Sequence, residues 1–253
     1  MKLRFLGTGT STGVPQIMCN CTVCRSADEH DKRLRASVLL TVSDKNLLID
    51  CGPDFREQML RSGNPELEAL IVTHSHYDHV GGVDDLRPYC TIGDGFPIYC
   101  KEDVAQDLRE RVPYCFAEHP YPGVPALNLN VVTTKPFMIG DIEVTPLPVM
   151  HYRLPIFGYR VGNLAYITDA KTIEDSTIGM IRGIDTLVIN ALRIKEHISH
   201  QNLSQALDVI RAVKPRVAYL THLSHDMGLH VDVSQRLPEN VKIAYDGLVI
   251  HIP

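Results

Sequence analysis

The chain has 253 residues, enough for one large domain or two small ones with a sizeable core. Its formal net charge is −5 and it contains no basic run, which disfavours a protein that lives on duplex nucleic acid. It has an odd number of cysteines, no apolar run long enough to span a bilayer, and a first segment too charged for a signal peptide, so we expect a cytoplasmic protein with no membrane partner.

Strand and helix signals alternate through the first part of the chain. Strands are predicted at residues 2–6, 36–50 with a turn at 43–46, 69–73 and 97–100. Helices are predicted at residues 53–62, with a proline at the start and a glycine after the end, and at 102–111. Residues 112–126 carry four prolines and a glycine, which predicts an irregular loop near the pocket.

The second part of the chain repeats this order. Strands are predicted at residues 129–133, 141–149, 156–161, 163–168, 185–190 and 216–220, with a last pair within 241–252. One helix is predicted at 174–181. Another begins near Leu203, from which apolar residues fall on one helical face.

Two similarities within the chain indicate a duplicated plan. Residues 48–50 are similar to residues 166–169, and residues 70–76 are similar to residues 218–225. In each half, a buried strand delivers a polar side chain at its C-terminal end. Two such halves, packed sheet to sheet with helices outside, would gather these ends along one edge, so the pattern predicts an α/β sandwich.

A histidine-rich stretch follows the strand predicted at 69–73. His74 and His76 would point the same way, because side chains in a strand repeat every second residue, whereas Asp78 and His79 lie past the strand end. Imidazole suits several transition metals, and a carboxylate adds a hard oxygen ligand. The spacing favours two adjacent metals over one. The alternative is a solvated histidine-rich loop or an adventitious metal site.

Three further polar residues stand at the ends of predicted strands: His151, Asp169 and His222. Each has an ordinary explanation when taken singly. A histidine at a strand end is usually a surface or core residue, and an aspartate before a helix is commonly an N-cap. The repetition of one geometric rule favours a shared metal site instead.

The series His74-x-His76-x-Asp78-His79, followed by His151, Asp169 and His222, resembles the metallo-β-lactamase superfamily of hydrolases. The resemblance covers nearly the whole chain. It implies a single domain of residues 1–253, folded as a four-layer αββα sandwich whose two similar halves are roughly residues 1–128 and 129–253.

The same resemblance implies how the ligands divide between two catalytic divalent metals. One metal would bind His74, His76 and His151, the second would bind Asp78, His79 and His222, and Asp169 would bridge them. Zinc is the default for such nitrogen and oxygen ligands, and manganese or iron fits the same atoms. Asp50 matches an acidic residue that supports the ligands by hydrogen bonding in this superfamily; the alternative is a turn-forming role.

Three cysteines, Cys19, Cys21 and Cys24, lie within six residues. A structural zinc needs four ligands, and the fourth could be Cys51 or a histidine; the alternative is free thiols or a disulfide with one thiol left over. With the Thr-His-x-x-His segment at 221–225, the cluster resembles the phosphoribosyl 1,2-cyclic phosphate phosphodiesterase family of carbon–phosphorus lyase pathways. That resemblance implies an inserted loop at 18–35 and one structural zinc on the three cysteines and His225.

These resemblances imply a metal-dependent phosphodiesterase that acts on a small cyclic phosphate or nucleotide-like diester by attack of a metal-bridging hydroxide. Asp78 would orient the hydroxide. A histidine just before the helix near Leu203 would be the general acid that protonates the leaving alkoxide. His200 is the better positional match and His197 is the alternative; either could instead be an ordinary loop or cap residue.

Other functions stay open at this point. The same fold supports thioester or lactone hydrolysis and RNA 3′-end processing, although the short chain and its negative charge disfavour RNA. A non-catalytic metal-binding sensor is disfavoured because every expected ligand is present. The expected partner is a small phosphodiester; long nucleic acid and membranes are not expected, and both a homodimer and the identity of the substrate are left open.

Overall fold

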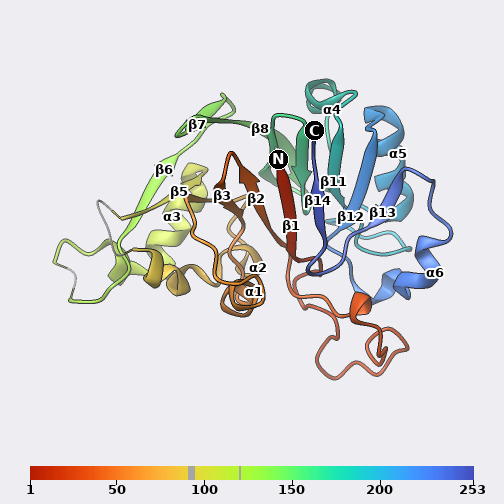
Figure 1. Ribbon diagram of the computed structural model, residues 1–253, viewed down its shortest axis with the longest axis horizontal. Helices are drawn as coiled ribbons and strands as arrows, with labels where there is room; N and C mark the ends of the chain where they lie inside the picture. The colour runs from red at the N-terminus through yellow and green to blue at the C-terminus, as the bar shows by residue number, and fades with distance from the viewer. Residues whose placement is uncertain (91–94, 120) are drawn as a thin grey trace.

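Two seven-stranded β-sheets lie face to face, with helices on the outer face of each (Figure 1). The computed structural model describes residues 1–90, 95–119 and 121–253. The prediction of a four-layer αββα sandwich is confirmed. None of the helices in these described ranges has the length and apolarity that a membrane crossing needs.

The strands of the first sheet are, from edge to edge, β14 (Val249–His251), β1 (Lys2–Gly7), β2 (Ser37–Val42), β3 (Lys45–Ile49), β4 (Ala69–Ile71), β5 (Phe96–Cys100) and β6 (Leu127–Val131). Those of the second sheet are β13 (Val241–Ile243), β12 (Val217–Thr221), β11 (Thr186–Asn190), β10 (Leu164–Ile167), β9 (Leu154–Val161), β8 (Ile142–His151) and β7 (Phe137–Ile139). The last two strands of the chain therefore lie in different sheets.

Three apolar layers hold the sandwich together. One lies between the two sheets, one between the first sheet and its helices, and one between the second sheet and its helices. The helices are α1 (Phe55–Arg61), α2 (Tyr77–Val80), α3 (Glu102–Arg111), α4 (Asp175–Ile181), α5 (Leu203–Val213) and α6 (His230–Ser234). Short 3-10 helices cover η1 (Glu29–Asp31), η2 (Val83–Tyr89), η3 (Pro113–Phe116) and η4 (His225–Met227).

The longer elements lie where the sequence predicts them. The predicted helices at 53–62, 102–111, 174–181 and from Leu203 match α1, α3, α4 and α5, whereas β6 begins two residues before its predicted start. The short elements β7, α2 and α6 were not predicted, because three to five residues are too few to show a periodicity. The loop predicted at 112–126 begins with η3, and its residue 120 lies outside the described residues.

Parallel pairing places the carboxyl ends of many strands at one edge of the sandwich. Strands β3 to β6 are parallel, as are β10 to β13. Strand β8 shares the direction of β10, because both are antiparallel to β9. The chain termini lie at the other edge, where the Met1 ammonium donates to the Ile252 carbonyl over 2.9 Å.

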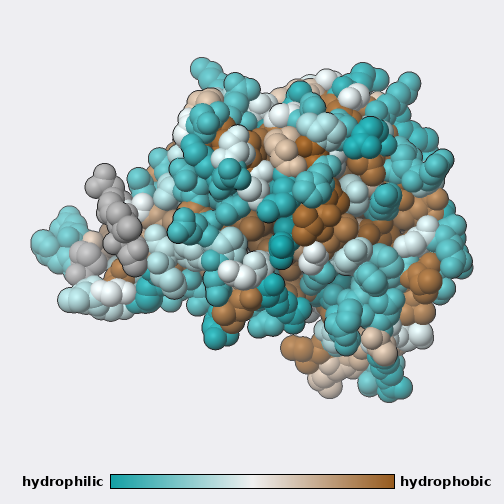
Figure 2. Space-filling view, viewed as in Figure 1, coloured by the Kyte–Doolittle hydropathy of each residue, from teal (hydrophilic) through white to brown (hydrophobic). Residues whose placement is uncertain are grey.

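A loop between β1 and β2 projects beyond the edge that holds the strand ends, at the lower right of Figure 1. Its base is held by Arg33, a buried guanidinium that donates to the Thr8 hydroxyl and the Ala244 carbonyl over 2.7 and 2.6 Å. At its outer part Ile17 and Met18 are 86% and 94% exposed, and hydrophobic side chains stand out there in Figure 2. This loop carries the three clustered cysteines.

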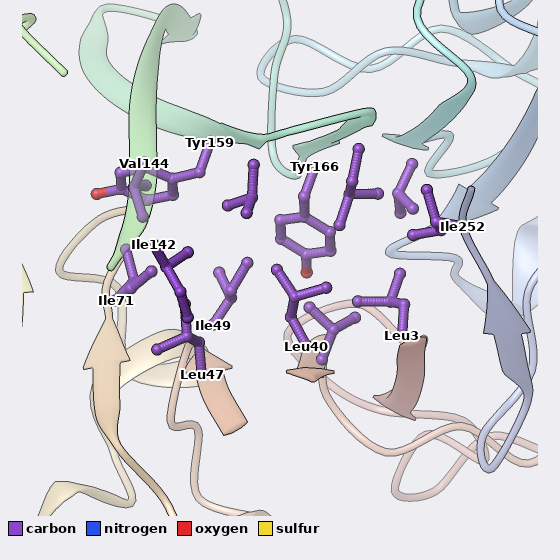
Figure 3. Close-up of a cluster of buried hydrophobic side chains, with 14 of the residues drawn as sticks. Leu3, Leu40, Leu47, Ile49, Ile71, Ile142, Val144, Tyr159, Tyr166 and Ile252 are labelled. Atoms are coloured by element: carbon purple, nitrogen blue, oxygen red, sulfur yellow. The ribbon is translucent and has the colours of Figure 1, made fainter. Parts of the chain in front are cut away.

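Two tyrosines lie in the layer between the sheets (Figure 3). Tyr159 donates its hydroxyl to the Val72 carbonyl of the opposite half over 2.7 Å. Tyr166 is equally buried, but its hydroxyl has no hydrogen-bond partner among the described residues. The two positions thus differ in hydrogen bonding while sharing residue type and burial.

We expect Tyr159→Phe to lower the free energy of unfolding by about 1–2 kcal/mol, because it leaves a buried carbonyl unpaired. Tyr166→Phe should change it by less than about 0.5 kcal/mol or raise it, because it removes an unpaired polar group. Urea unfolding of both variants at equal metal content makes the comparison. Equal losses in the two variants would contradict this account.

Candidate functional site

Polar side chains follow the strand ends at the common edge. Asp50, Asp169 and His222 each lie just past a strand and have left-handed backbone φ values of 65°, 57° and 55°. Residues with a side chain rarely adopt this conformation, which costs on the order of 1–2 kcal/mol each. The turn it produces ends each strand abruptly and directs these side chains away from the continuing strand direction.

The short helix α2 brings two more ligand candidates to the edge. The Cys51 N–H donates to the His79 carbonyl over 2.7 Å, which docks α2 against the end of β3. A side chain at Gly52 would begin 2.1 Å from the Asp78 carbonyl oxygen, so this close approach requires glycine. Asp78 and His79 are consequently buried on the inner side of the edge.

One group of side chains consists of His74, His76 and His151. A ring nitrogen from each lies within 4.8 Å of the others, close enough to share an ion. The ring centroid of His76 lies 4.6 Å from that of His74 and 4.9 Å from that of His151. His74 and His151 are buried whereas His76 is exposed, so this group faces solvent on the side of His76.

A second group, fully buried, consists of Asp78, His79, Asp169 and His222. The Nε2 of His79 lies 3.2 Å from a carboxylate oxygen of both Asp78 and Asp169. The Nε2 of His222 lies 3.1 Å from Asp169 and 3.5 Å from Asp78. His74 and His79 rings are 4.2 Å apart, so the two groups adjoin.

The histidine nitrogen atoms that form no hydrogen bond show whether these groups fit metal ions. The Nε2 atoms of His74, His79 and His222 are buried and form no hydrogen bond in the described part of the chain, despite the nearby carboxylates. Bonds of about 2.0–2.1 Å to a tetrahedral ion place neighbouring ligand atoms about 3.3 Å apart, which the 3.1–3.5 Å separations match. The residues therefore fit divalent cations, which would join these atoms in place of direct hydrogen bonds.

Hydrogen bonds from neighbouring groups orient the histidine rings. His79 Nδ1 lies 2.7 Å from the Asp50 carboxylate, which in turn accepts from the backbone N–H and hydroxyl of Thr73. A carboxylate partner keeps the proton on Nδ1 and leaves Nε2 bare for a metal. The His151 Nδ1 similarly faces the carbonyl oxygens of Asp169 and Ser199, at 2.8 and 3.0 Å. For Asp50, these contacts favour the supporting role over a turn-forming one.

Burial and charge set the protonation of the second group. Burial opposes ionisation of Asp78 and Asp169, but the adjacent His79 and His222 outweigh it and hold both pKa values below the usual range. Burial likewise opposes charge on His222, yet Asp169 and Asp78 raise its pKa to about 9. Metal ions would replace the protons that these imidazoles otherwise carry.

His200 lies against this site, and His197 lies behind it. The His200 ring is 4.6 Å from that of His151 and 4.9 Å from that of His222, and its Nδ1 is 3.6 Å from Asp169. Among the described residues, the ring of His197 packs against that of His200, with ring centroids 5.2 Å apart, and against no other histidine of the site. The geometry thus favours His200 over His197 as the residue that could reach a reacting group.

The cysteine cluster forms a separate candidate centre. One ligand atom each of Cys19, Cys21, Cys24 and His225 lies within 4.8 Å of the others. The Nδ1 of His225 lies 3.5 Å from the Cys19 sulfur and 3.3 Å from the Cys21 sulfur, near the roughly 3.5 Å expected between ligands of one tetrahedral zinc. Cys51 lies instead in the apolar layer under the first sheet.

The thiols of this cluster differ in acidity. A hydrogen bond from the Cys24 backbone N–H lowers the pKa of Cys21 to about 6. Burial raises the pKa of Cys24 to about 11. Cys21 therefore ionises before Cys24, and a thiolate is the form that binds a metal.

Sequence patterns alone do not identify several supporting residues. Asn190 closes strand β11 and pairs with both backbone groups of Ala170, over 2.8 and 2.9 Å, which fixes the turn after Asp169. Asn190 could be recognised in the sequence as a polar residue at the end of an otherwise apolar strand. Thr73 has a clearer signal, because a Thr-His pair recurs at Thr221 and His222.

Comparison with known proteins adds independent findings. Residues 45–223 match the family described as the Beta-lactamase superfamily domain. The chain is 46% identical over 251 residues to an octanoyltransferase of Porphyromonas gingivalis, covering 98% of this chain and 51% of the relative. The chain thus spans about half the length of that relative.

Solved structures show the same fold. A crystal structure described as a new diphosphatase from the PhnP family superposes with a TM-score of 0.93 at 38% identity, covering 98% of this chain and 96% of the other. The Zn²⁺-bound PqqB of Methylobacterium extorquens superposes over both full chains, with a TM-score of 0.81 at 18% identity. The latter likeness shows the fold alone.

We expect a metal-replete sample to carry about three divalent ions per chain, two at the edge of the sheets and one in the cysteine cluster. Cys19→Ala should remove about one of them, because it breaks a four-ligand centre. Cys90→Ala, which alters a cysteine outside every candidate group, should remove none. Elemental analysis that returns a single tightly held ion in the wild type would contradict the two-site arrangement.

Asp50→Asn should weaken metal binding in the group that contains His79 by about 10–100-fold, because a neutral amide accepts the Nδ1 proton more weakly than a carboxylate does. Retention of metal against chelators of graded strength measures this. Asp141→Asn, at an exposed ion pair with Lys45, is the matched control. An unchanged metal content in Asp50→Asn, or equal loss from the cysteine cluster, would show that Asp50 does not act through His79.

Proposed function

Because this chain belongs to the β-lactamase superfamily of metal-dependent hydrolases, we propose that it hydrolyses a small phosphodiester, such as a cyclic phosphate or a nucleotide-like diester. The observation that carries the proposal is that the two groups of candidate ligands adjoin, with the rings of His74 and His79 4.2 Å apart. Two adjacent cations suit displacement at phosphorus, because they can neutralise both the attacking and the leaving oxygen. The diphosphatase relative, 38% identical, supports phosphorus over carbon as the centre attacked.

The proposed metal ligands are those of the two groups. His74, His76 and His151 would hold one zinc or manganese ion, Asp78, His79 and His222 the other, and Asp169 both. When bound, such ions lower the pKa of water to about 7 and so provide a nucleophile without a strong base. The cysteine cluster with His225 would hold one structural zinc.

Asp78 has two tasks in this proposal. One carboxylate oxygen faces His79 and His222, and the carboxylate would accept a hydrogen bond from the attacking water and so orient it. Its low pKa keeps it ionised at neutral pH, so it would orient the water as a hydrogen-bond acceptor without taking up its proton. The exposed side of the site, at His76, is where substrate would enter.

His200 is the proposed general acid. An alkoxide leaves poorly unless it is protonated, and a histidine can supply that proton near neutral pH. Burial lowers the pKa of His200 to about 3, so the ring is neutral before substrate arrives. A phosphodiester anion placed beside the ring favours its charged form, so proton uptake would accompany substrate binding.

One other activity has some support. The diphosphatase relative favours a diphosphate bond, in which the same kind of P–O bond is broken, as a second candidate substrate. Octanoyl transfer is not proposed for this chain, which spans only about half of the octanoyltransferase relative.

A cytoplasmic location and a homodimer stay predictions.

The function is tested with a panel assayed on metal-replete protein. It contains ribose cyclic phosphates, 2′,3′- and 3′,5′-cyclic nucleotides, a dinucleotide diphosphate, an octanoyl thioester, a lactone and a precursor tRNA. We expect the small phosphorus esters to be hydrolysed, with activity lost on chelation and restored by Zn²⁺ or Mn²⁺. Faster turnover of the thioester, lactone or RNA would replace the proposal, and no turnover of any ester would favour a metal sensor.

The role of His200 is tested with His200→Ala. The variant should keep its metals and lose about 10²–10⁴-fold in kcat on an alkyl diester, but much less on bis(p-nitrophenyl) phosphate, whose leaving group needs no proton. His251→Ala, at an exposed position on β14, is the control. Equal losses on both esters would exclude a general-acid role, and the selective loss appearing in His197→Ala instead would move the role to His197.

A further inference from the structure

The side chain of Lys171 connects the metal site to the segment that carries His200. Its ammonium donates to the His197 carbonyl over 2.8 Å and to the side-chain oxygen of Gln205 over 3.1 Å. No carboxylate of the described residues forms an ion pair with Lys171. A half-buried ammonium thus contacts only neutral oxygens.

The position of Lys171 is electrostatically unfavourable. Gln205 is the third residue of α5, and with Asn202 it forms a capping box that satisfies the first N–H groups of the helix. The start of a helix carries a partial positive charge and favours anions over cations. A lysine held there by neutral partners departs from this preference for anions. Departures of this kind are most often found at functional sites.

The backbone around Lys171 is tied to both halves of the site. The Lys171 N–H donates to the carbonyl of Met150, the residue before His151, over 2.7 Å. The Ala170 carbonyl accepts from the Gln201 N–H over 3.0 Å, and the Asp169 carbonyl faces His151 Nδ1. Residues 169–171 therefore join the ligand strands to the segment of residues 197–201.

His200 itself has little to hold it. Its Nδ1 is buried and has no hydrogen-bond partner in the described part of the chain. The ring is therefore oriented by its packing and by the backbone on either side, which is anchored at the His197 carbonyl, at the Gln201 N–H and, through His151, at the Ser199 carbonyl. Lys171 makes the first of these anchors and Ala170 the second.

We propose that Lys171 is a positioning residue that fixes the segment of residues 197–201 so that His200 faces the leaving group. The inference rests on the proposed function for its kinetic consequence. Its structural content, that the ammonium orders this segment, stands apart from any activity. The lysine reaches across from the turn that carries Asp169, so one short segment would set both the ligand geometry and the proton donor.

The kinetic test compares Lys171→Met with Lys195→Met, which alters an exposed lysine near the same segment. Substrates are aryl methyl phosphates whose phenols span a range of acidity. Lys171→Met should lose roughly tenfold or more in kcat on the least acidic phenol and less than about twofold on nitrophenol, because a misplaced acid matters only for poor leaving groups. In His200→Ala the added Lys171→Met change should have no further effect on this dependence.

A second readout is independent of activity. Amide hydrogen exchange of residues 196–202 should accelerate in Lys171→Met and not in Lys195→Met, with three metals retained in both. Uniform kinetic loss on all phenols, metal loss, or unchanged exchange would overturn the inference. If the wild type hydrolyses no phosphodiester, the proposed function fails, and faster exchange in Lys171→Met would still support Lys171 as the anchor whereas unchanged exchange would overturn it.

Discussion

Asp169 is the residue on which the whole site depends. Its carboxylate lies 3.2 Å from His79, 3.1 Å from His222 and 3.6 Å from His200, while its carbonyl faces His151 at 2.8 Å. A buried anion in such surroundings is costly unless cations share its charge. The imidazoles, or the ions they would bind, supply that charge, so the stability of this corner and its capacity to bind metal have the same origin.

The fold supplies the positions at which this charge is concentrated. Parallel strands deliver Asp50, Asp169 and His222 to one edge, and left-handed turns at these residues stop the strands there. The conformational cost is offset by the packing of three apolar layers, which fixes the strands rigidly. The close approach of Gly52 to the Asp78 carbonyl then allows α2 to pack against the end of β3. The strained turns and the tight packing therefore position the same group of side chains.

Much of this arrangement could be predicted from the sequence, and the reason is chemical. Candidate ligand residues are scarce types at regular strand-end positions, so His74, His151, Asp169 and His222 stand out from apolar surroundings. The residues that orient them do not, because Asn190 and Lys171 act through contacts with backbone atoms distant along the chain. Short elements such as α2 escaped prediction for a related reason, since docking against β3 rather than periodicity determines where they form.

The meeting of the two chain ends has a consequence for how this domain can be combined with others. The first and last strands pair side by side, and the N-terminal ammonium reaches Ile252 at the edge opposite the candidate ligands. A second domain fused at either end would grow away from the mouth of the site and leave its access free. The same closeness makes the sandwich suitable for insertion into a host protein or for circular permutation, because both ends emerge at one point of the surface.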